Sequence, residues 1–430
     1  MQDPTRSVLL IAYHFPPCSE SSGYMRTLCF ARDLRGLGWR PDVLTATVNA
    51  YDRASTELYN WIPPELRVHR ALAFDTQRHL SIKGRYPSFL ALPDRLVSWL
   101  PAAVMVGVAA VLRHNLKVVW STYPLATSHI IGYLVARLTG RPWIADFRDP
   151  MVEFNATKGS WAPSNQTLRD CRLWVEKRCL EKASALVYCT EGARRSVIER
   201  YGDAIAARTH VIPNGYDEDS FGALADQASP AAAATTPYKL LHSGTIYPTD
   251  DRDPSAFFAA LARMKAEALL DAGKLQVMFR ASGQDHWLNS KIAAYNLTDI
   301  VQIGTRISYH EALRETSGAD GLLVFQGYTS NPAIPAKVYE YIRAGRPIFA
   351  MVDHAGDTAA LLARVACENV ADLRSVEEIY TRLKSFVVDL SEQRARGVPL
   401  AVAQTYSRHH RAAELAALLD ATLGQGQARA

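Results

Sequence analysis

The segment 334–352, IPAKVYEYIRAGRPIFAMV, combines a lysine and a glutamate in a pattern that suits a phosphate-bearing ligand. Pro335 favours a helix start, because its missing N–H costs nothing in the first turn, and Gly345 favours a helix end. Lys337 then lies in the first turn, where a cation opposes the helix dipole unless an anion is present. Free N–H groups at a helix N-terminus bind phosphate. Glu340 shares a helix face with Lys337, and its carboxylate can accept hydrogen bonds from both hydroxyls of a ribose. We therefore expect a diphosphate here, with a solvated Lys337–Glu340 surface pair as the competing interpretation.

Small residues at the ends of other predicted strands extend this site. Gly244 and Thr245 follow the strand Tyr238–His242, and Gly283 follows the strand Gln276–Arg280. A glycine lets a ligand approach the backbone closely. We expect the diphosphate or nucleotide to lie against these strand ends.

Two segments of the first half also carry candidate residues. Gly23, in SESSGYMR, lies between a strand end and a helix start, which suits close approach of a phosphate or sugar; simple turn-making is the alternative. Asp146, Arg148 and Asp149 lie at the carboxyl end of the strand Trp143–Phe147, where open α/β sheets place ligands. An Asp–Arg pair that only pins the loop is the alternative for this segment.

Two series of alternating strands and helices must position these residues. The first includes the strands Val8–Tyr13 and Asp42–Thr47, and the second starts at Tyr238–His242. Such series predict parallel sheets with right-handed crossovers, so we expect an α/β fold of two Rossmann-like doubly wound domains facing across a cleft. The expected boundaries are 1–216 plus a C-terminal helix within 405–430 that packs back on the N-terminal domain, a linker at 217–237, and 238–404.

Composition narrows the function classes. The chain has 430 residues, 48% of them hydrophobic and 21% charged, which is typical of globular domains. The net charge of +5 is spread without a long Lys/Arg run, so no nucleic-acid partner is expected. Six cysteines without metal-binding spacing indicate reduced thiols, and the start MQDPTRS is no secretory signal, so a cytoplasmic location is expected.

An apolar stretch, Leu96–Leu112, carries no charged residue. It is short for a bilayer span, and Pro101 interrupts it. Cations flank it within the region 83–117, as in a helix that rests on a membrane surface. A buried core helix and such a peripheral membrane contact both remain open.

The segment 334–352 resembles the C-terminal signature of retaining glycosyltransferases of family 4, whose two-Rossmann-domain architecture is called GT-B. Other segments resemble the family in order, among them VVWSTYPLATSHIIGYLVARLTGRPWIADFRDPM, HVIPNGYD and LLHSGTIYPTDDRDPSAFFAAL. The similarity covers nearly the whole chain and points to the polysaccharide-assembly branch. It implies a glycosyltransferase that moves a sugar from a nucleotide-sugar donor, held by the C-terminal domain, to a hydroxyl acceptor. A lipid-linked or growing polysaccharide glycan at the inner face of the cell membrane is the expected acceptor.

The resemblance also suggests roles for individual residues. Arg306 lies where the family's backbone meets the base, and Arg252 where the family has a phosphate-binding cation. The motif Asp251-Arg252-Asp253 is formally a DxD pattern, but no metal and no cofactor are expected. The expected catalytic residues are Arg148, Asp149, Lys337 and Arg252, and the expected donor-binding residues are Gly23, Gly244, Thr245, Gly283, Arg306, Ile334, Pro335 and Glu340.

One position departs from the family pattern. Many members carry two glutamates in the spacing E-x7-E; Glu340 fills the second position, but Pro332 stands at the first. Backbone groups of residues 331–334 are expected to substitute for the missing carboxylate. Two other functions stay open, a nucleotide-sugar 2-epimerase and a non-catalytic nucleotide-sugar-binding subunit. His14 and His129 are expected to be structural.

Overall fold

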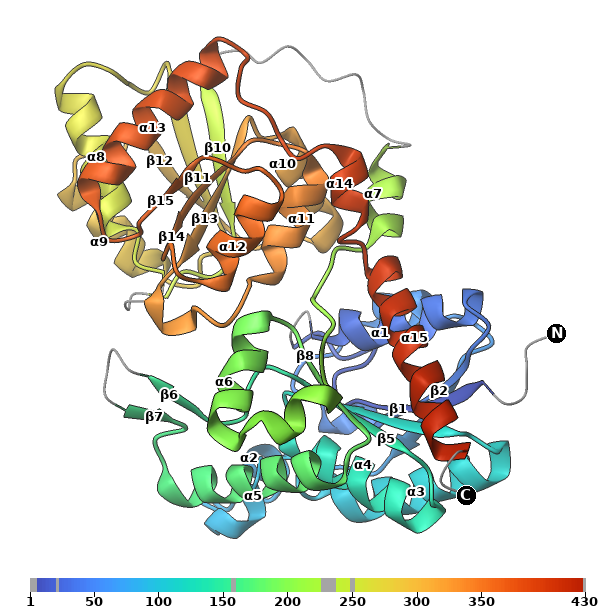
Figure 1. Ribbon diagram of the computed structural model, residues 1–430. Coiled ribbons are helices and arrows are strands. Elements are labelled where there is room, and N and C mark those ends of the chain that lie inside the picture. The colour runs from blue at the N-terminus through green and yellow to red at the C-terminus, as the bar shows by residue number, and fades with distance from the viewer. Residues whose placement is uncertain (1–5, 21–22, 156–159, 226–236, 248–251, 428–430) are drawn as a thin grey trace. The chain divides into compact units, whose positions relative to one another are not determined.

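The computed structural model describes residues 6–20, 23–155, 160–225, 237–247 and 252–427. The chain divides into two compact units, Met1–Pro213 with Arg408–Ala430, and Asn214–Ser407. Each unit contains one large parallel sheet (Figure 1). Residues 226–236 of the predicted linker, and Asp251 of the DxD motif, lie outside the described residues.

The first unit has a seven-stranded sheet in the order β3-β2-β1-β4-β5-β8-β9, and every neighbouring pair is parallel. Its central strands are short apolar runs because both sheet faces are covered; all five residues of β1 are buried. The strands are β1 (Ser7–Ile11), β2 (Arg40–Ala46), β3 (Arg67–Ala71), β4 (Val118–Thr122), β5 (Trp143–Arg148), β8 (Ala185–Tyr188) and β9 (Thr209–Val211). A separate antiparallel hairpin joins β6 (Glu153–Asn155) to β7 (Ser160–Ala162).

Helices cover both faces of this sheet. On one face, alternate strand residues such as Leu9 and Leu44 pack with α3, α4, α5 and α6. On the other face, residues such as Val8 and Val43 pack with α1 and α15. The helices are α1 (Tyr24–Gly36), α2 (Thr76–His79), α3 (Trp99–His114), α4 (Ala126–Thr139), α5 (Gln166–Lys182), α6 (Glu191–Tyr201) and α15 (Arg408–Gln427).

The C-terminal helix α15 packs against α1 in the first unit, which confirms the prediction that it returns to the N-terminal domain. Its buried residues Ala412, Leu415, Ala416 and Leu419 form a stripe of helical period that meets the core. Arg6 and Asp420 add an ion pair of 2.6 Å between the two ends of the chain.

The apolar stretch predicted as a buried or interfacial helix forms α3. Its buried residues include Trp99, Ala103 and Gly107, whereas Met105 and Leu112 are 68% and 64% exposed. The helix therefore has a core face and an apolar outer face. Among the described residues, no helix combines the length and apolarity needed to cross a bilayer.

The second unit has a six-stranded parallel sheet in the order β12-β11-β10-β13-β14-β15, the Rossmann order 3-2-1-4-5-6. The strands are β10 (Tyr238–Ser243), β11 (Leu275–Arg280), β12 (Val301–Gly304), β13 (Gly321–Gln326), β14 (Ile348–Val352) and β15 (Val370–Ala371). One face packs with α8 (Ser255–Ala266), α9 (Asp285–Ala294) and α13 (Val376–Ser391). The other packs with residues from α7 (Glu218–Ala225), α10 (Tyr309–Gly318), α11 (Ala336–Ala344), α12 (Asp357–Arg364) and α14 (Leu400–Gln404).

A helix lies within the segment 217–237 that the sequence predicts as the linker. Helix α7 (Glu218–Ala225) belongs to the second unit, where Phe221 lies in the core. Arg343 of α11 binds Glu218 through Nε and Nη2, with the Nε–Oε2 distance at 2.9 Å. The short apolar pattern of α7 is too brief to stand out in the sequence, and contacts with α11 stabilise it.

Candidate functional site

The start of α11 carries the lysine and glutamate singled out from the sequence. Pro335 is the N-cap and Gly345, with a φ of 65°, is the C-cap, so both helix ends lie where the sequence predicts them. Lys337 Nζ lies 2.8 Å from Glu340 Oε2. The Glu340 side chain is 12% exposed and accepts a hydrogen bond of 3.2 Å from the Tyr309 hydroxyl. The ion pair of the competing interpretation does form. It is not fully solvated, however, because the Glu340 side chain is largely buried and is bound by Tyr309.

His242, which is not among the predicted site residues, lies near this helix start. Its Nδ1 is 2.9 Å from the Leu323 carbonyl, which can only accept, so Nδ1 carries the proton. Nε2 is buried and has no hydrogen-bond partner within the described part of the chain. Burial, together with the charges of Arg252 and Lys337, lowers the pKa of His242 to about 4. The ring is therefore neutral at pH 7, with an unused acceptor beside two cations.

Arg252 is held at the end of β10. Its guanidinium donates to the Thr245 carbonyl at 3.1 Å and to Gln326 Oε1 at 3.5 Å, and it lies 5.0 Å from the centroid of the Tyr247 ring. Gly283 has a φ of 73°, and a Cβ on it would lie 3.6 Å from Thr245 Cγ2. The structure thus brings Thr245, Arg252 and Gly283 together, with Gly244 adjoining, at the carboxyl ends of β10 and β11.

The remaining candidates of the second unit lie less centrally. Arg306 is exposed on the loop after β12, the edge strand. Ile334 is half-buried and packs against the core at the start of α11. Asp253 accepts hydrogen bonds from the Ser255 N–H and hydroxyl, at 2.9 and 2.6 Å, so it serves the beginning of α8.

The loop around Pro332 already uses several of the backbone groups expected to replace the missing glutamate. The Asn331 carbonyl accepts from the Asp357 N–H at 2.9 Å, and the Ala333 N–H donates to the Ser330 carbonyl at 2.9 Å. The Ala333 carbonyl accepts from the Thr358 hydroxyl at 3.2 Å. These bonds occupy some of the loop's backbone groups and reduce what it can offer a donor sugar.

In the first unit, a small pocket brings together residues from three strand ends. Gly23, His14 and Arg148 line it, with Thr122 and Tyr123. Arg148 has a φ of 63°, an uncommon conformation for a residue with a side chain and one that is frequent at functional sites. Burial and the Arg148 charge lower the pKa of His14 to about 4. Gly23 has a φ of −59°, so its value lies in leaving space rather than in backbone freedom.

Asp146 and Asp149 have different environments although they are three residues apart. Asp146 is fully buried and forms a bidentate ion pair with Arg26, at 2.8 and 3.0 Å. Arg26 also donates to the Ile212 and Pro213 carbonyls, at 3.0 and 3.1 Å. The pair that pins the loop therefore exists, but its cation is Arg26, which sequence reasoning missed. Asp149 is exposed beyond the end of β5.

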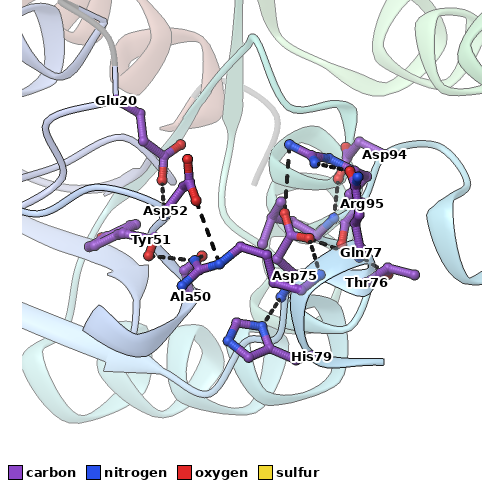
Figure 2. A network of polar contacts seen from close by, with 12 residues as sticks. Glu20, Ala50, Tyr51, Asp52, Asp75, Thr76, Gln77, His79, Asp94 and Arg95 are labelled. Atoms are coloured by element: carbon purple, nitrogen blue, oxygen red, sulfur yellow. Dashed lines mark hydrogen bonds and ion pairs between the residues drawn. The ribbon is translucent and has the colours of Figure 1, made fainter. Parts of the chain in front are cut away.

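A polar network holds the loops that follow β1, β2 and β3, as Figure 2 shows. Glu20 accepts from the Asp52 N–H at 2.5 Å, which joins the first two loops. Asp75 caps α2 and lies 3.7 Å from Arg95, which donates to Gln77 Oε1 at 2.6 Å. Because Glu20 Oε2 is also 3.8 Å from His14 Nε2, the network reaches the pocket.

His129 is structural, as the sequence predicted. It is fully buried in α4, and its Nδ1 lies 2.8 Å from Ser121 Oγ, which also accepts from the Trp143 indole at 2.8 Å. Burial lowers the pKa of His129 to about 3, so the ring is neutral.

Comparison with known proteins identifies the two-unit architecture. Residues 25–215 match the model of the glycosyl transferase 4-like domain. No curated protein sequence matches the chain. Anabaena HepE, solved in complex with UDP, is similar in structure with a TM-score of 0.65 and 15% identity, over 97% of this chain and 100% of that chain. Sucrose-phosphate synthase from Thermosynechococcus elongatus has a TM-score of 0.60 and 17% identity, over 99% and 98%. A glycosyltransferase from Rickettsia africae has a TM-score of 0.64 and 13% identity, over 97% and 99%.

Proposed function

We propose that this chain, which carries a glycosyl transferase 4-like domain over residues 25–215 in a GT-B fold, transfers a sugar from a nucleotide-diphosphate donor to a hydroxyl acceptor. The observation that carries the proposal is the group of cations at the carboxyl edge of the second sheet. Lys337 at the start of α11 and Arg252 after β10 lie near enough to His242 to lower its pKa. Two cations and a helix N-terminus are suited to binding a diphosphate.

The same cations explain how transfer is accelerated. As the bond between the sugar and the diphosphate breaks, negative charge grows on the leaving diphosphate. Fixed cations and helix N–H groups bind that charge more strongly than the ground state, which lowers the barrier. Lys337 and Arg252 supply the charge, while Gly244 and Gly283 leave room for the phosphates. Glu340 takes the ribose hydroxyls, and Arg306 contacts the base.

The acceptor side of the proposal rests on the first unit. Arg148 and Asp149 stand at the carboxyl end of β5, and the pocket beside them is lined by His14 and Gly23. We assign Asp149 to orient the acceptor hydroxyl and Arg148 to contact the donor sugar. We further propose a retaining, metal-independent transfer to a lipid-linked or polysaccharide glycan.

Contact with the cytoplasmic face of a membrane completes the proposal. Within or next to the region 83–117, Ile82, Phe89, Met105 and Leu112 are 80%, 67%, 68% and 64% exposed. Arg85 and Arg113 stand near these apolar side chains in the sequence. Apolar anchors with flanking cations suit an interfacial contact with anionic lipid. Flotation with anionic vesicles tests the membrane contact. Protein that stays at the bottom of the gradient would contradict it.

The direct test begins with a thermal-shift screen of nucleoside diphosphates, with UDP first because HepE was solved with it. A bound ligand raises the unfolding temperature by mass action. The protein is then incubated with the nucleotide sugar that corresponds to the nucleoside diphosphate giving the largest shift, with and without acceptor glycans and in the presence of EDTA. Sugar transfer supports the proposal, whereas isomerised donor without acceptor indicates an epimerase. Binding without either product indicates a binding subunit.

A further inference from the structure

A large cavity of the first unit lies at the opposite end of β5 from Arg148. It measures about 800 Å³, within the range of small-ligand sites, and Trp143 and Ser184 line it. Trp143 begins β5 and Arg148 ends it. The five residue steps between them span roughly 17 Å, so the two places are separate.

Two helices form the walls of this cavity, and each presents an aromatic ring followed by two cations. Residues Trp174, Arg178 and Lys182 of α5 are spaced four apart, so they share one helix face. The opposite wall has Tyr133 and Arg137 of α4, and Arg141 just beyond its end, at the same spacing. Trp174 is 49% exposed.

The positive charge of the cavity is poorly balanced. Among the described residues, its four cations have a single ion-pair partner, Glu181, which lies 2.9 Å from Arg178. Arg137 donates to the Tyr133 hydroxyl at 3.1 Å, so its charge is not neutralised. Arg141 Nε is buried without a hydrogen-bond partner in the described chain. A buried guanidinium donor left unused is costly and suits an incoming anionic acceptor.

Helix stability accounts for only part of this arrangement. Cations near helix C-termini interact favourably with the helix dipole, which explains Arg137 and Lys182 in the last turns of α4 and α5. The ion pair with Glu181, three residues on in the same helix, explains Arg178. Neither effect explains Arg141, whose Nε has no acceptor among the described residues, or the large aromatic ring of Trp174 left half-exposed nearby.

We propose that this cavity is a second binding site, for an anionic oligosaccharide whose sugar residues carry carboxylate groups. Each such sugar offers a carboxylate to a guanidinium and an apolar C–H face to an aromatic ring. Successive cations on α5 are separated by about 6 Å of helix rise, so they can meet charges on neighbouring sugars. The concave surface can receive sugar rings, which a flat bilayer surface could not fill.

Isothermal titration of the full chain with tetragalacturonate tests the proposal, with maltotetraose as the neutral probe. The acidic tetramer should bind, more weakly as salt rises, and the neutral one should bind at least tenfold more weakly. The double variant Arg137→Gln/Lys182→Gln should lose at least tenfold in affinity, while the matched pair Arg382→Gln/Lys384→Gln on α13 stays within twofold. Trp174→Ala should also weaken binding. The titration uses no sugar donor and measures no turnover. Its result therefore does not depend on whether the proposed sugar transfer is correct.

Three outcomes would overturn the site. Equal binding of both tetramers would exclude charge recognition. Unchanged affinity in Arg137→Gln/Lys182→Gln, with its unfolding temperature unaltered, would place any binding elsewhere. Full displacement by an equal concentration of inorganic phosphate would mean that the cations bind free anions, and binding of anionic vesicles but not of the tetramer would mean a membrane surface.

Discussion

Replacing Lys337 by alanine removes the cation from the first turn of α11. A hydrogen bond from a charged group to phosphate contributes about 1.5–3 kcal/mol, and each 1.4 kcal/mol is tenfold in affinity. The dissociation constant of the best nucleoside diphosphate should therefore rise roughly 10- to 150-fold. The fold should tolerate the change, because a helix pair such as Lys337–Glu340 contributes only about 0.3–0.5 kcal/mol and the lysine is 34% exposed.

Titration calorimetry with two ligands separates the role of Lys337 from that of Glu340. Lys337→Ala should weaken the binding of inorganic pyrophosphate and of the nucleoside diphosphate alike, because the lysine is proposed to contact the phosphates. Glu340→Gln should weaken the nucleotide more than pyrophosphate, because it acts on the ribose. Lys337→Arg, which keeps the charge, should retain affinity within a few-fold, and Lys384→Gln is the control for a lysine lost elsewhere.

Two results would refute this reasoning. If Lys337→Ala binds the nucleotide within twofold of the unaltered protein, the first turn of α11 does not hold the phosphates. If its unfolding free energy falls by several kcal/mol, the lysine supports the fold rather than the ligand.

Three further predictions concern stability and are measured by urea unfolding. The pKa of His242 is lowered from 6.5 to about 4, so the neutral ring stabilises the fold above pH 6.5, and this stabilisation is lost as the pH falls toward 4. The free energy of unfolding should therefore fall by about 2 kcal/mol between pH 7.5 and 5 through this residue. Over the same pH range, the fall for His242→Gln should be smaller by that amount. Arg26→Gln leaves Asp146 buried without its cation and should cost roughly 3–5 kcal/mol, and a loss below 1 kcal/mol would show that water reaches the carboxylate. Gly132→Ala should cost about 1–3 kcal/mol, because its Cβ would lie 2.7 Å from Trp143 Nε1; unchanged stability would mean that α4 can shift.

Local sequence predicts most of the fold because its signals act over a few residues. The predicted strands Tyr238–His242 and Gln276–Arg280 agree with β10 and β11 to within about one residue at each end. Pro335 and Gly345 mark the ends of α11 through backbone geometry alone. Helix α7 escaped prediction because eight residues carry too little periodic signal, and its packing against α11 decides its state.

What the sequence determined by itself was the two α/β series, the helix start that carries Lys337 and Glu340, and the strand ends where we propose that ligands bind. Only the tertiary structure joined Arg26 to Asp146, which stand 120 positions apart in the chain, and left His242 with an unused nitrogen beside two cations. The facing rows of cations on α4 and α5 likewise appear only when the helices pack. Backbone preference acts between neighbours in sequence, whereas burial, ion pairing and pKa depend on which distant residues share a volume.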